Sequence, residues 1–402
     1  MTLGRTFRAF QYRDFRRLWA GACASSIGTW MQKLAQSWLV LEMSDSPFLL
    51  GVDAFLGEIP ILLFSLAGGV AADRIDRRRL LVASQVLQMG AAFLLAGLIA
   101  TGAVRVWHIL CLSFVVGLAQ AFGGPAYQAL LPGLVPAEHL ANAIALNSIQ
   151  FNLARVIGPV LGGLALTRLG AAWCFAVNGV SFLAVIVSVV SLKLQFIPPR
   201  TGESFLTSLK AGLGFVRRRA AMPALVALAF STTLLGIPLI VFLPVFARDV
   251  FQRGPSAYML LLSVSGGGSI VGALLVAALS HARHKGRLAL LLLIGFGVTA
   301  TAFAFSWSLA LSCAFLFLAG MAMIGVFSLV TSLVQEITPD EVRGRVMSVY
   351  NVAFRGGMPV GNLITGSLVP QFGAPVVLAA NGVLLTALGF YYLLMQRKVA
   401  AL

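Results

Sequence analysis

Ionisable side chains inside long apolar segments are the residues of this sequence that could do chemistry. Glu58 and Asp53 fall in an apolar run at 48–71, and Lys33 falls in a run at 16–41. A charged group at the centre of a bilayer costs about 2.5–3.5 kcal/mol by insertion scales, so each of these groups needs a reason to be there. Glu58, the deeper of the two acids, could take up and release a proton during a functional cycle. Alternatively, Lys33 lies at a comparable depth and could simply neutralise Glu58 in a buried pair.

Two arginines and a set of polar residues on the apolar segments are candidates for lining a substrate cavity. Arg155 and Arg355 could attract an anionic substrate, or they could equally donate to facing carbonyl groups and fix the helices. The uncharged candidates are Trp30, Gln32, Gln36, Gln120, Asn152 and Asn351. For each of these, hydrogen bonding between helices is the alternative role.

Catalytic and metal-binding patterns are not found in the sequence. The glycine-rich stretch at 263–276 lacks the Lys-Ser/Thr pair of a phosphate-binding loop, so close helix packing explains it. The four histidines fall at the ends of apolar runs or in loops. The sequence therefore predicts a protein that is not an enzyme and that needs no cofactor or metal.

The segments that carry these residues are expected to cross a membrane. Hydrophobic residues make up 59% of the 402 residues and charged residues only 10%, a composition that a soluble domain does not have. Apolar runs of about 20 residues span a hydrocarbon core as helices. The sequence predicts an all-α polytopic membrane protein with twelve spans, at residues 16–41, 48–71, 80–100, 106–128, 146–167, 173–194, 223–246, 257–280, 288–306, 308–334, 347–369 and 376–395.

The net charge of +16 is distributed unevenly between the two sides of these spans. The amino terminus, the even-numbered connections and the carboxyl tail hold 22 of the 29 Lys and Arg residues, and the opposite side holds four. By the positive-inside rule, both termini are predicted to be cytoplasmic. A nucleic-acid partner is not expected, because it would need a solvated basic face with base-contacting groups.

Two halves of six spans each are indicated by the loop lengths and by an internal repeat. The longest polar connection, 198–222, is predicted to be a cytoplasmic central loop between bundles at 1–197 and 223–402. A shift of 203 residues gives ten identities over residues 136–179, including Pro136 with Pro339 and Asn178 with Asn381. The matching spans share one orientation, which predicts a parallel repeat and two pseudo-symmetric six-helix bundles.

The loop after the second span combines glycine, aspartate and arginine residues at a regular spacing. Residues 68–81 read GGVAADRIDRRRLL, in which Gly69 is followed after three residues by Asp73 and Arg74, and then by Arg77 and Arg78. This pattern resembles the gating-loop signature of the major facilitator superfamily, in which Asp76 here replaces the second glycine. A glycine here allows close helix approach, and Asp73 could cap or pair at a helix end.

The fifth span resembles the motif of the exporter branches of that superfamily. It contains Gly158, Pro159, Gly162 and Gly163, and small residues of this kind let helices pack closely around a bend. Residues 7–47 and 123–163 also resemble the branch of enterobactin and macrolide exporters. The resemblance implies a major facilitator fold and favours efflux over uptake.

The sequence as a whole is interpreted as a secondary active transporter of a small organic solute, such as a siderophore, a drug or a related metabolite. The resemblance implies export across the inner membrane by alternating access, and the lack of an ATP-binding motif predicts that the proton gradient drives it by antiport. The expected partners are the solute, protons and the lipid bilayer, and the chain is expected to be a monomer. The alternatives are an importer or facilitator of a small metabolite, and a non-transporting membrane sensor on the same fold.

Overall fold

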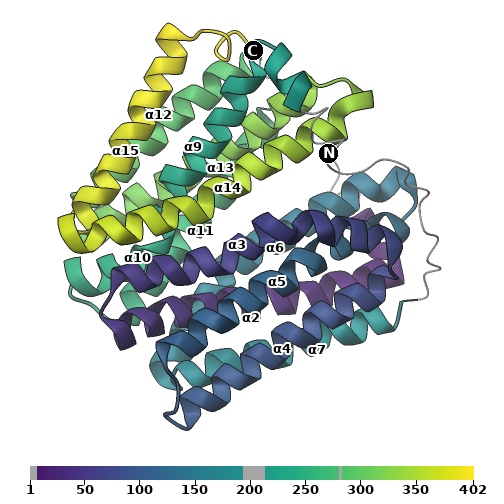
Figure 1. Cartoon of the computed structure of the whole chain (residues 1–402), viewed down its shortest axis with the longest axis vertical. Helices are drawn as coiled ribbons and strands as arrows, with labels where there is room; N and C mark the ends of the chain where they lie inside the picture. The colour runs from purple at the N-terminus through teal and green to yellow at the C-terminus, as the bar shows by residue number, and fades with distance from the viewer. Residues whose placement is uncertain (1–6, 193–212, 280–282) are drawn as a thin grey trace. The chain divides into compact units, whose positions relative to one another are not determined.

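The first half of the chain forms six long helices. The structure, a computed structural model, describes residues 7–192, 213–279 and 283–402. A short 3₁₀ turn, η1 (Arg8–Gln11), comes before the first long helix, and another, η2 (Leu131–Gly133), follows the fourth. The long helices of this half are α2 (Arg13–Ser44), α3 (Pro47–Arg74), α4 (Arg77–Ala100), α5 (Val106–Leu130), α6 (Ala137–Arg168) and α7 (Ala171–Val190), as labelled in Figure 1.

The second half repeats this order of helices. Its long helices are α9 (Met222–Val241), α11 (Pro255–Ala278), α12 (Lys285–Ala304), α13 (Leu309–Glu336), α14 (Asp340–Phe372) and α15 (Ala374–Phe390). After α9 the chain continues through α10 (Leu243–Val245) into a π-helical turn, η3 (Phe246–Val250), and α15 runs into a second such turn, η4 (Tyr391–Met395). The predicted all-α architecture is confirmed.

Among the described residues, ten helical segments are long and apolar enough to cross a membrane. The helices α2 and α14, of 32 and 33 residues, are the two long ones outside this group. Both carry polar and charged residues that were singled out from the sequence, such as Lys33 and Gln36 on α2 and Asn351 and Arg355 on α14. Polar residues on membrane helices usually face the bundle or a water-filled space.

Two compact units divide the chain, and each is described by itself. One comprises Met1–Asp45 and Leu56–Thr201, and the other comprises Ser46–Phe55 and Gly202–Leu402. The first turns of α3 thus group with the second unit, because a β-carbon at Gly51 would lie 2.6 Å from the carbonyl oxygen of Asn362. The proposed boundary at 197 did not include this division of α3. Most of the proposed central loop lies outside the described residues, although 213–218 are helical.

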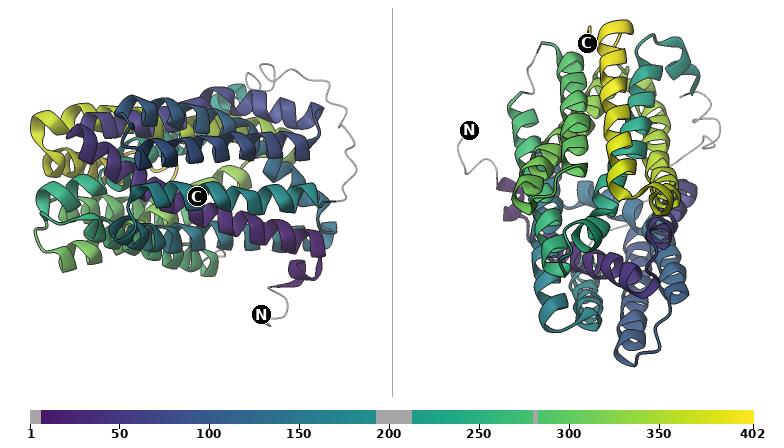
Figure 2. Two further views of the ribbon diagram at one scale, coloured as in Figure 1. Left: turned by 90° about the horizontal axis from the view of Figure 1, so that it is seen from below. Right: turned by 90° about the vertical axis from the view of Figure 1, so that its left-hand side faces the viewer.

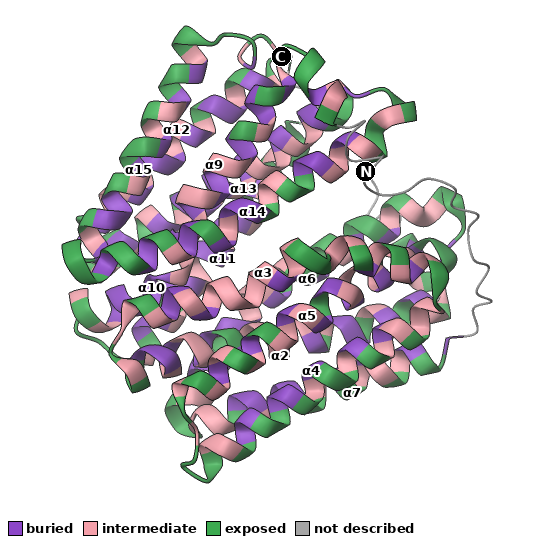
Figure 3. Cartoon of the chain, viewed as in Figure 1, coloured by how far each residue is buried: buried purple, intermediate pink, exposed green. Residues whose placement is uncertain are grey.

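The helices of each unit pack in corresponding pairs. In the first unit, α2 packs on α6 and α7, and α4 packs on α5 and α7. In the second, α9 packs on α14, and α12 packs on α13 and α15. Figure 2 shows the long helices of each unit running side by side, and Figure 3 shows that they carry both buried and exposed residues along their lengths.

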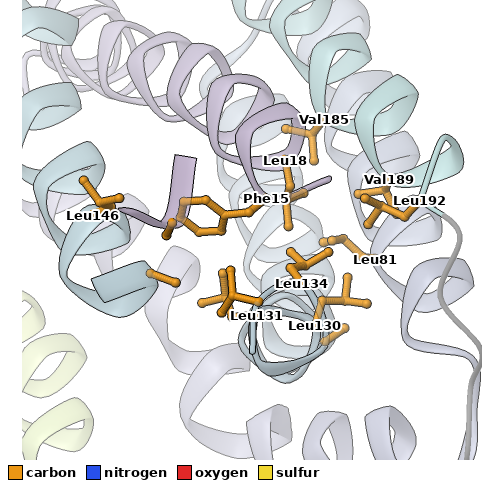
Figure 4. Packing of buried hydrophobic residues seen from close by; sticks show 14 of the residues in the cluster. Phe15, Leu18, Leu81, Leu130, Leu131, Leu134, Leu146, Val185, Val189 and Leu192 are labelled. Carbon is orange, nitrogen blue, oxygen red and sulfur yellow. The ribbon is translucent and has the colours of Figure 1, made fainter. Parts of the chain in front are cut away.

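An apolar cluster holds together the predicted cytoplasmic end of the first unit. The Phe15 ring of α2 points toward Leu146 of α6, whereas Leu18 lies on the side of Val185 of α7, as Figure 4 shows, and all four are at most 3% exposed. Residues from the ends of α3, α4, α5 and α6 complete the cluster. Because these side chains come from all six helices, the cluster fixes the end of the bundle that carries the basic loops.

Candidate functional site

A chain of polar side chains connects three helices in the first unit. Asn178 on α7 donates from Nδ2 to Oε1 of Gln32 on α2 at 2.6 Å. Gln32 Nε2 lies 3.5 Å from Gln36 Oε1, and Gln36 Nε2 donates to Ser113 Oγ on α5 at 2.9 Å. Gln32, Asn178 and Ser113 are all at most 9% exposed. Gln32 therefore forms a hydrogen bond between helices, and Ser113, which carries no sequence signal for a site, is a partner that sequence reasoning missed.

Trp30 brings two cations together on the neighbouring surface of α2. The Lys33 ammonium lies 5.4 Å from the centre of the Trp30 ring, and the Arg155 guanidinium carbon of α6 lies 5.7 Å from it. Phe151 packs edge-on against the same ring, with 6.2 Å between centroids. We call Trp30, Lys33, Arg155 and Phe151 the Trp30 cluster. Two cations and two aromatic faces form a site that attracts anionic and aromatic groups.

The two acids of α3 differ in burial. Asp53 is 7% exposed, and Glu58 is half-buried five residues further along. Five residues of helix correspond to about 7.5 Å along the axis and to different faces. Pro60 lies two residues beyond Glu58 within the helix. A proline lacks the N–H that would bond to the carbonyl of Leu56, so the backbone ladder is interrupted beside Glu58.

The Lys33–Glu58 pair remains a prediction, since the contact that the structure shows for Lys33 is the one with Trp30.

The remaining cavity candidates lie on three different helices. Gln120 on α5 is exposed, and its Oε1 lies 3.5 Å from Nε2 of Gln88 on α4. Asn152 on α6 donates to the Ser148 carbonyl of its own helix at 2.9 Å. Asn351 and Arg355 are exposed on α14, in the second unit. The structure thus brings together Trp30, Lys33 and Arg155, and separately Gln32 and Gln36.

The glycines of the exporter motif form the contact between α6 and α2. A β-carbon at Gly158 would lie 2.4 Å from Trp30 Cβ and 2.8 Å from the Ile27 carbonyl oxygen. A β-carbon at Gly162 would lie 2.9 Å from Met31 Cα, while Pro159 and Gly163 are buried in the same helix. Only glycine fits at such distances. The motif therefore sets how closely the Trp30 cluster can assemble.

The same contact recurs in the second unit. A β-carbon at Gly361 of α14 would lie 2.0 Å from the Leu234 carbonyl oxygen of α9. Under the shift of 203 residues, Gly361 corresponds to Gly158 and Leu234 corresponds to Met31. The repeat predicted from the sequence is therefore present in the packing of the helices, with a glycine at each equivalent crossing.

The prediction that Gly69 allows close helix approach is wrong, because the neighbouring Gly68 has this role. Within the described part of the chain, no atom of another helix lies within 4 Å of a β-carbon placed at Gly69. A β-carbon at Gly68 would lie 2.1 Å from the Ala121 carbonyl oxygen of α5. The helical rotation of about 100° per residue turns Gly69 away from α5.

The arginines of the loop bind the ends of three helices. Arg77 donates from Nη1 to the Ala129 carbonyl of α5 at 2.9 Å and from Nε to the Ala72 carbonyl of α3 at 3.3 Å. Arg78 donates from Nη1 to the Leu192 carbonyl, just beyond α7, at 2.7 Å. The last carbonyls of a helix lack intrahelical partners and carry negative partial charge, which makes them good acceptors for a guanidinium. Arg74 is exposed, and Asp73 is half-buried.

Asp76, the residue that departs from the family pattern, caps α4. Its Oδ1 accepts from the Arg78 backbone N–H at 2.9 Å, and its Oδ2 pairs with Arg78 Nη2 at 3.2 Å. Partial burial raises the pKa of Asp76, but the hydrogen bonds from Arg78 and the charges of Arg78 and Arg79 outweigh this, so that the pKa lies below its usual range. The capping role expected for Asp73 thus belongs to Asp76.

Replacing Asp76 with alanine is expected to lower stability by about 0.5–2 kcal/mol near neutral pH, because the helix cap is lost. Since the pKa of Asp76 is lowered on folding, its contribution is complete above the unfolded pKa and is lost as the pH falls through the folded value. Thermal unfolding of both proteins at about pH 7 and about pH 3 tests this, and the difference should be smaller in acid. Asp73→Ala is the matched control. An equal loss in both variants would contradict the assignment.

Comparison with known proteins identifies the family of this chain. Residues 5–401 match the profile of the family described as transmembrane secretion effector. The chain belongs to this family. The transporter is 22% identical over 371 residues to macrolide efflux protein A of Streptococcus pyogenes, covering 89% of this chain and 90% of that protein. It is 25% identical over 361 residues to the enterobactin exporter EntS of Escherichia coli strain HS, covering 88% and 84%. The resemblance to this branch is confirmed.

Solved structures place the transporter in the major facilitator fold. The nucleoside transporter NupG superposes with a TM-score of 0.74 at 13% identity, covering 96% of this chain and all of that one. A D-xylose–proton symporter superposes with a TM-score of 0.73 at 15% identity, covering 97% and 100%. The family match and the two relatives show a multi-pass membrane transporter for a small molecule and not an enzyme, as the sequence predicted.

Proposed function

We propose that this transporter exports a small organic solute across the inner membrane in exchange for protons, working as a monomer by alternating access. The observation that carries the proposal is the match, over nearly 90% of the chain, to two proteins named for efflux and export. The exporter-type glycines at the α2–α6 contact agree with it. Siderophores and drugs are the solute classes suggested by the names of these relatives.

The Trp30 cluster is the proposed solute contact of the first unit. Its aromatic faces and its two cations offer stacking and charge attraction at one place. Arg355 and Asn351 are the proposed contacts of the second unit, and Gln120 and Asn152 are proposed to line the cavity. Glu58 is the proposed proton carrier, with Asp53 as the second candidate, because these acids lie within a membrane-length helix.

Uptake is the second candidate function. It is favoured by one observation, namely that the proteins of similar fold include a D-xylose–proton symporter. A likeness at 15% identity concerns the fold alone, so it has less weight than the exporter relatives. A sensor on the same fold would bind a solute without moving it.

Flux in vesicles of known orientation tests the direction. Inside-out vesicles that contain the transporter, energised with an acidic lumen, are expected to accumulate labelled macrolide or enterobactin. A protonophore should abolish this accumulation, and vesicles without the transporter are the control. Accumulation confined to right-side-out vesicles would contradict export and establish uptake. Saturable binding of either probe without flux in both orientations would establish a sensor.

The proposed orientation, with both termini in the cytoplasm, predicts the position of two reporters. A reporter fused after Arg219, which precedes α9, should report a cytoplasmic location, because six spans return the chain to its starting side. A reporter fused after Arg253, between η3 and α11, should report a periplasmic location. Alkaline phosphatase and fluorescent-protein fusions measure this in whole cells. If both reporters lie on one side, α9 does not span the membrane.

A further inference from the structure

Two adjoining hollows follow one face of α2 in the first unit. The first, of about 450 Å³, is lined by Arg17, Ala20 and Gly21 of α2 and by the end of α7. The second, of about 330 Å³, is lined by residues of α6 and α7 and by four residues of α2, namely Ala24, Ile27, Gly28 and Met31. The α2 residues recur every three or four positions, so both hollows lie on the same side of the helix. We call the two hollows together the α2–α7 groove.

Glycines form the floor of the groove. A β-carbon at Gly21 would lie 2.6 Å from the Ala184 carbonyl oxygen, and one at Gly28 would lie 2.5 Å from Ser181 Oγ. The two helices therefore pack closely at both glycines, against the α7 backbone at Gly21 and against the Ser181 side chain at Gly28. Val187 and Val180 on α7 are 67% and 56% exposed. Exposed apolar walls on a membrane-spanning bundle face lipid chains.

The groove has the length of one lipid leaflet. From Arg17 to Met31, α2 rises by about 21 Å at 1.5 Å per residue. Half of a bilayer, including its headgroups, measures about 20–22 Å. The groove therefore extends from the headgroup region to the middle of the membrane, with Arg17 at its polar end.

Arg17 supplies a charge at that polar end. It lies among apolar and hydroxyl-bearing residues, and Ser188 Oγ donates to its backbone carbonyl at 3.0 Å. Among the residues that the structure describes, its guanidinium group makes no hydrogen bond or ion pair, although Arg16 next to it donates to the Phe10 carbonyl at 3.0 Å. Arginine binds phosphate through two parallel hydrogen bonds, and basic residues at this depth attract anionic lipids.

We propose that the α2–α7 groove binds one anionic phospholipid of the leaflet nearer the amino terminus. The lipid phosphate pairs with Arg17, and one acyl chain lies over Gly21 and Gly28. The occupant is a lipid and not the transported solute, because exposed valines of α7 line both hollows and the Trp30 cluster is not part of the lining.

Lipid retention by the purified transporter tests the proposal. Native mass spectrometry with added phosphatidylglycerol should show one tightly held lipid, and phosphatidylethanolamine should be held less tightly. Arg17→Gln should weaken phosphatidylglycerol retention about fivefold, the effect of one charge at the membrane surface. Arg13→Gln is the matched control, since Arg13 is exposed at the same end of α2 but does not line the groove. The Arg13→Gln variant should retain phosphatidylglycerol as tightly as the wild type does.

A second variant tests the acyl-chain path independently of charge. Ala24 is an exposed residue that lines the second hollow. Ala24→Phe should fill the hollow and weaken retention of both lipids, without any change at Arg17. If Arg17→Gln and Arg13→Gln weaken retention equally, the lipid is held by surface charge alone and the proposal is wrong. It is also wrong if Ala24→Phe retains lipid like the wild type. The Ala24→Phe result decides the matter if Arg17→Gln does not fold.

Discussion

Glu58→Gln is expected to abolish proton-driven export while leaving solute binding intact. Glutamine keeps the size of the side chain but cannot exchange a proton at the half-buried position in α3. In proteoliposomes with an imposed pH gradient, the variant should show neither solute-dependent proton movement nor uphill solute flux. Binding of the labelled solute to the purified protein should remain within about twofold of the wild type, since the Trp30 cluster is unchanged.

Two further variants separate this role from a structural one. Asp53→Asn removes the other acid of α3, which is more buried and lies on a different face, and it should retain coupling if Glu58 is the carrier. If Glu58 only neutralises Lys33, Glu58→Gln leaves a cation without its partner, and the double change Lys33→Met, Glu58→Gln should restore transport. Solute-dependent proton movement that persists in Glu58→Gln would exclude Glu58 as the carrier. Loss in Asp53→Asn alone would assign the role to Asp53.

Gly158→Ala and Gly361→Ala are each expected to destabilise the transporter by about 1–3 kcal/mol, the usual cost of overpacking. The added β-carbon would lie 2.4 Å from Trp30 Cβ at the first position and 2.0 Å from the Leu234 carbonyl oxygen at the second. To accommodate the methyl group, α6 must move away from α2 in Gly158→Ala, and α14 must move away from α9 in Gly361→Ala. Thermal unfolding in detergent measures the loss, and transport should fall with it, because Gly158 adjoins the proposed solute contact.

Gly69→Ala is the matched control for these glycine changes. It adds the same methyl group within a helix, at a position with open space around it. Alanine is favoured over glycine in a helix by about 1 kcal/mol, so the melting temperature of this variant should be unchanged or higher. If all three variants change the melting temperature in the same direction, helix propensity and not close packing would explain the results.

The fold could be predicted from the sequence because the bilayer restricts the choice of structure. A membrane segment must bond its own backbone and must be long enough to cross, so apolar length and charge distribution define the helices. The division of α3 could not be predicted in this way. Ser46–Phe55 is continuous with the rest of its helix in sequence, and contacts such as those of Gly51 with Asn362 and Gly366 group it with the second unit.

The candidate site was predicted less completely, because membrane helices use polar residues both for packing and for function. Gln32 was selected as a cavity residue, but it bonds to Asn178, which the sequence singled out only through its repeat partner Asn381. The pairing of Lys33 and Arg155 on one tryptophan depends on the rotation of α6 about its axis. That rotation is set by the glycine contacts, which hydropathy alone does not specify.

The arginine contacts at the loop between α3 and α4 imply unequal acid tolerance in the two units. In the first unit, Arg77 and Arg78 hold backbone carbonyls, and neither a guanidinium nor a carbonyl titrates at any pH that a cell experiences. In the second unit, the equivalent helices α12 and α13 are joined by Lys285 and the Glu336 carboxylate, 2.5 Å apart. Protonation removes that carboxylate charge. Only acid well below cytoplasmic pH protonates a carboxylate that is paired with a lysine, so strong acid would break this link while the contacts of Arg77 and Arg78 with carbonyl groups persist.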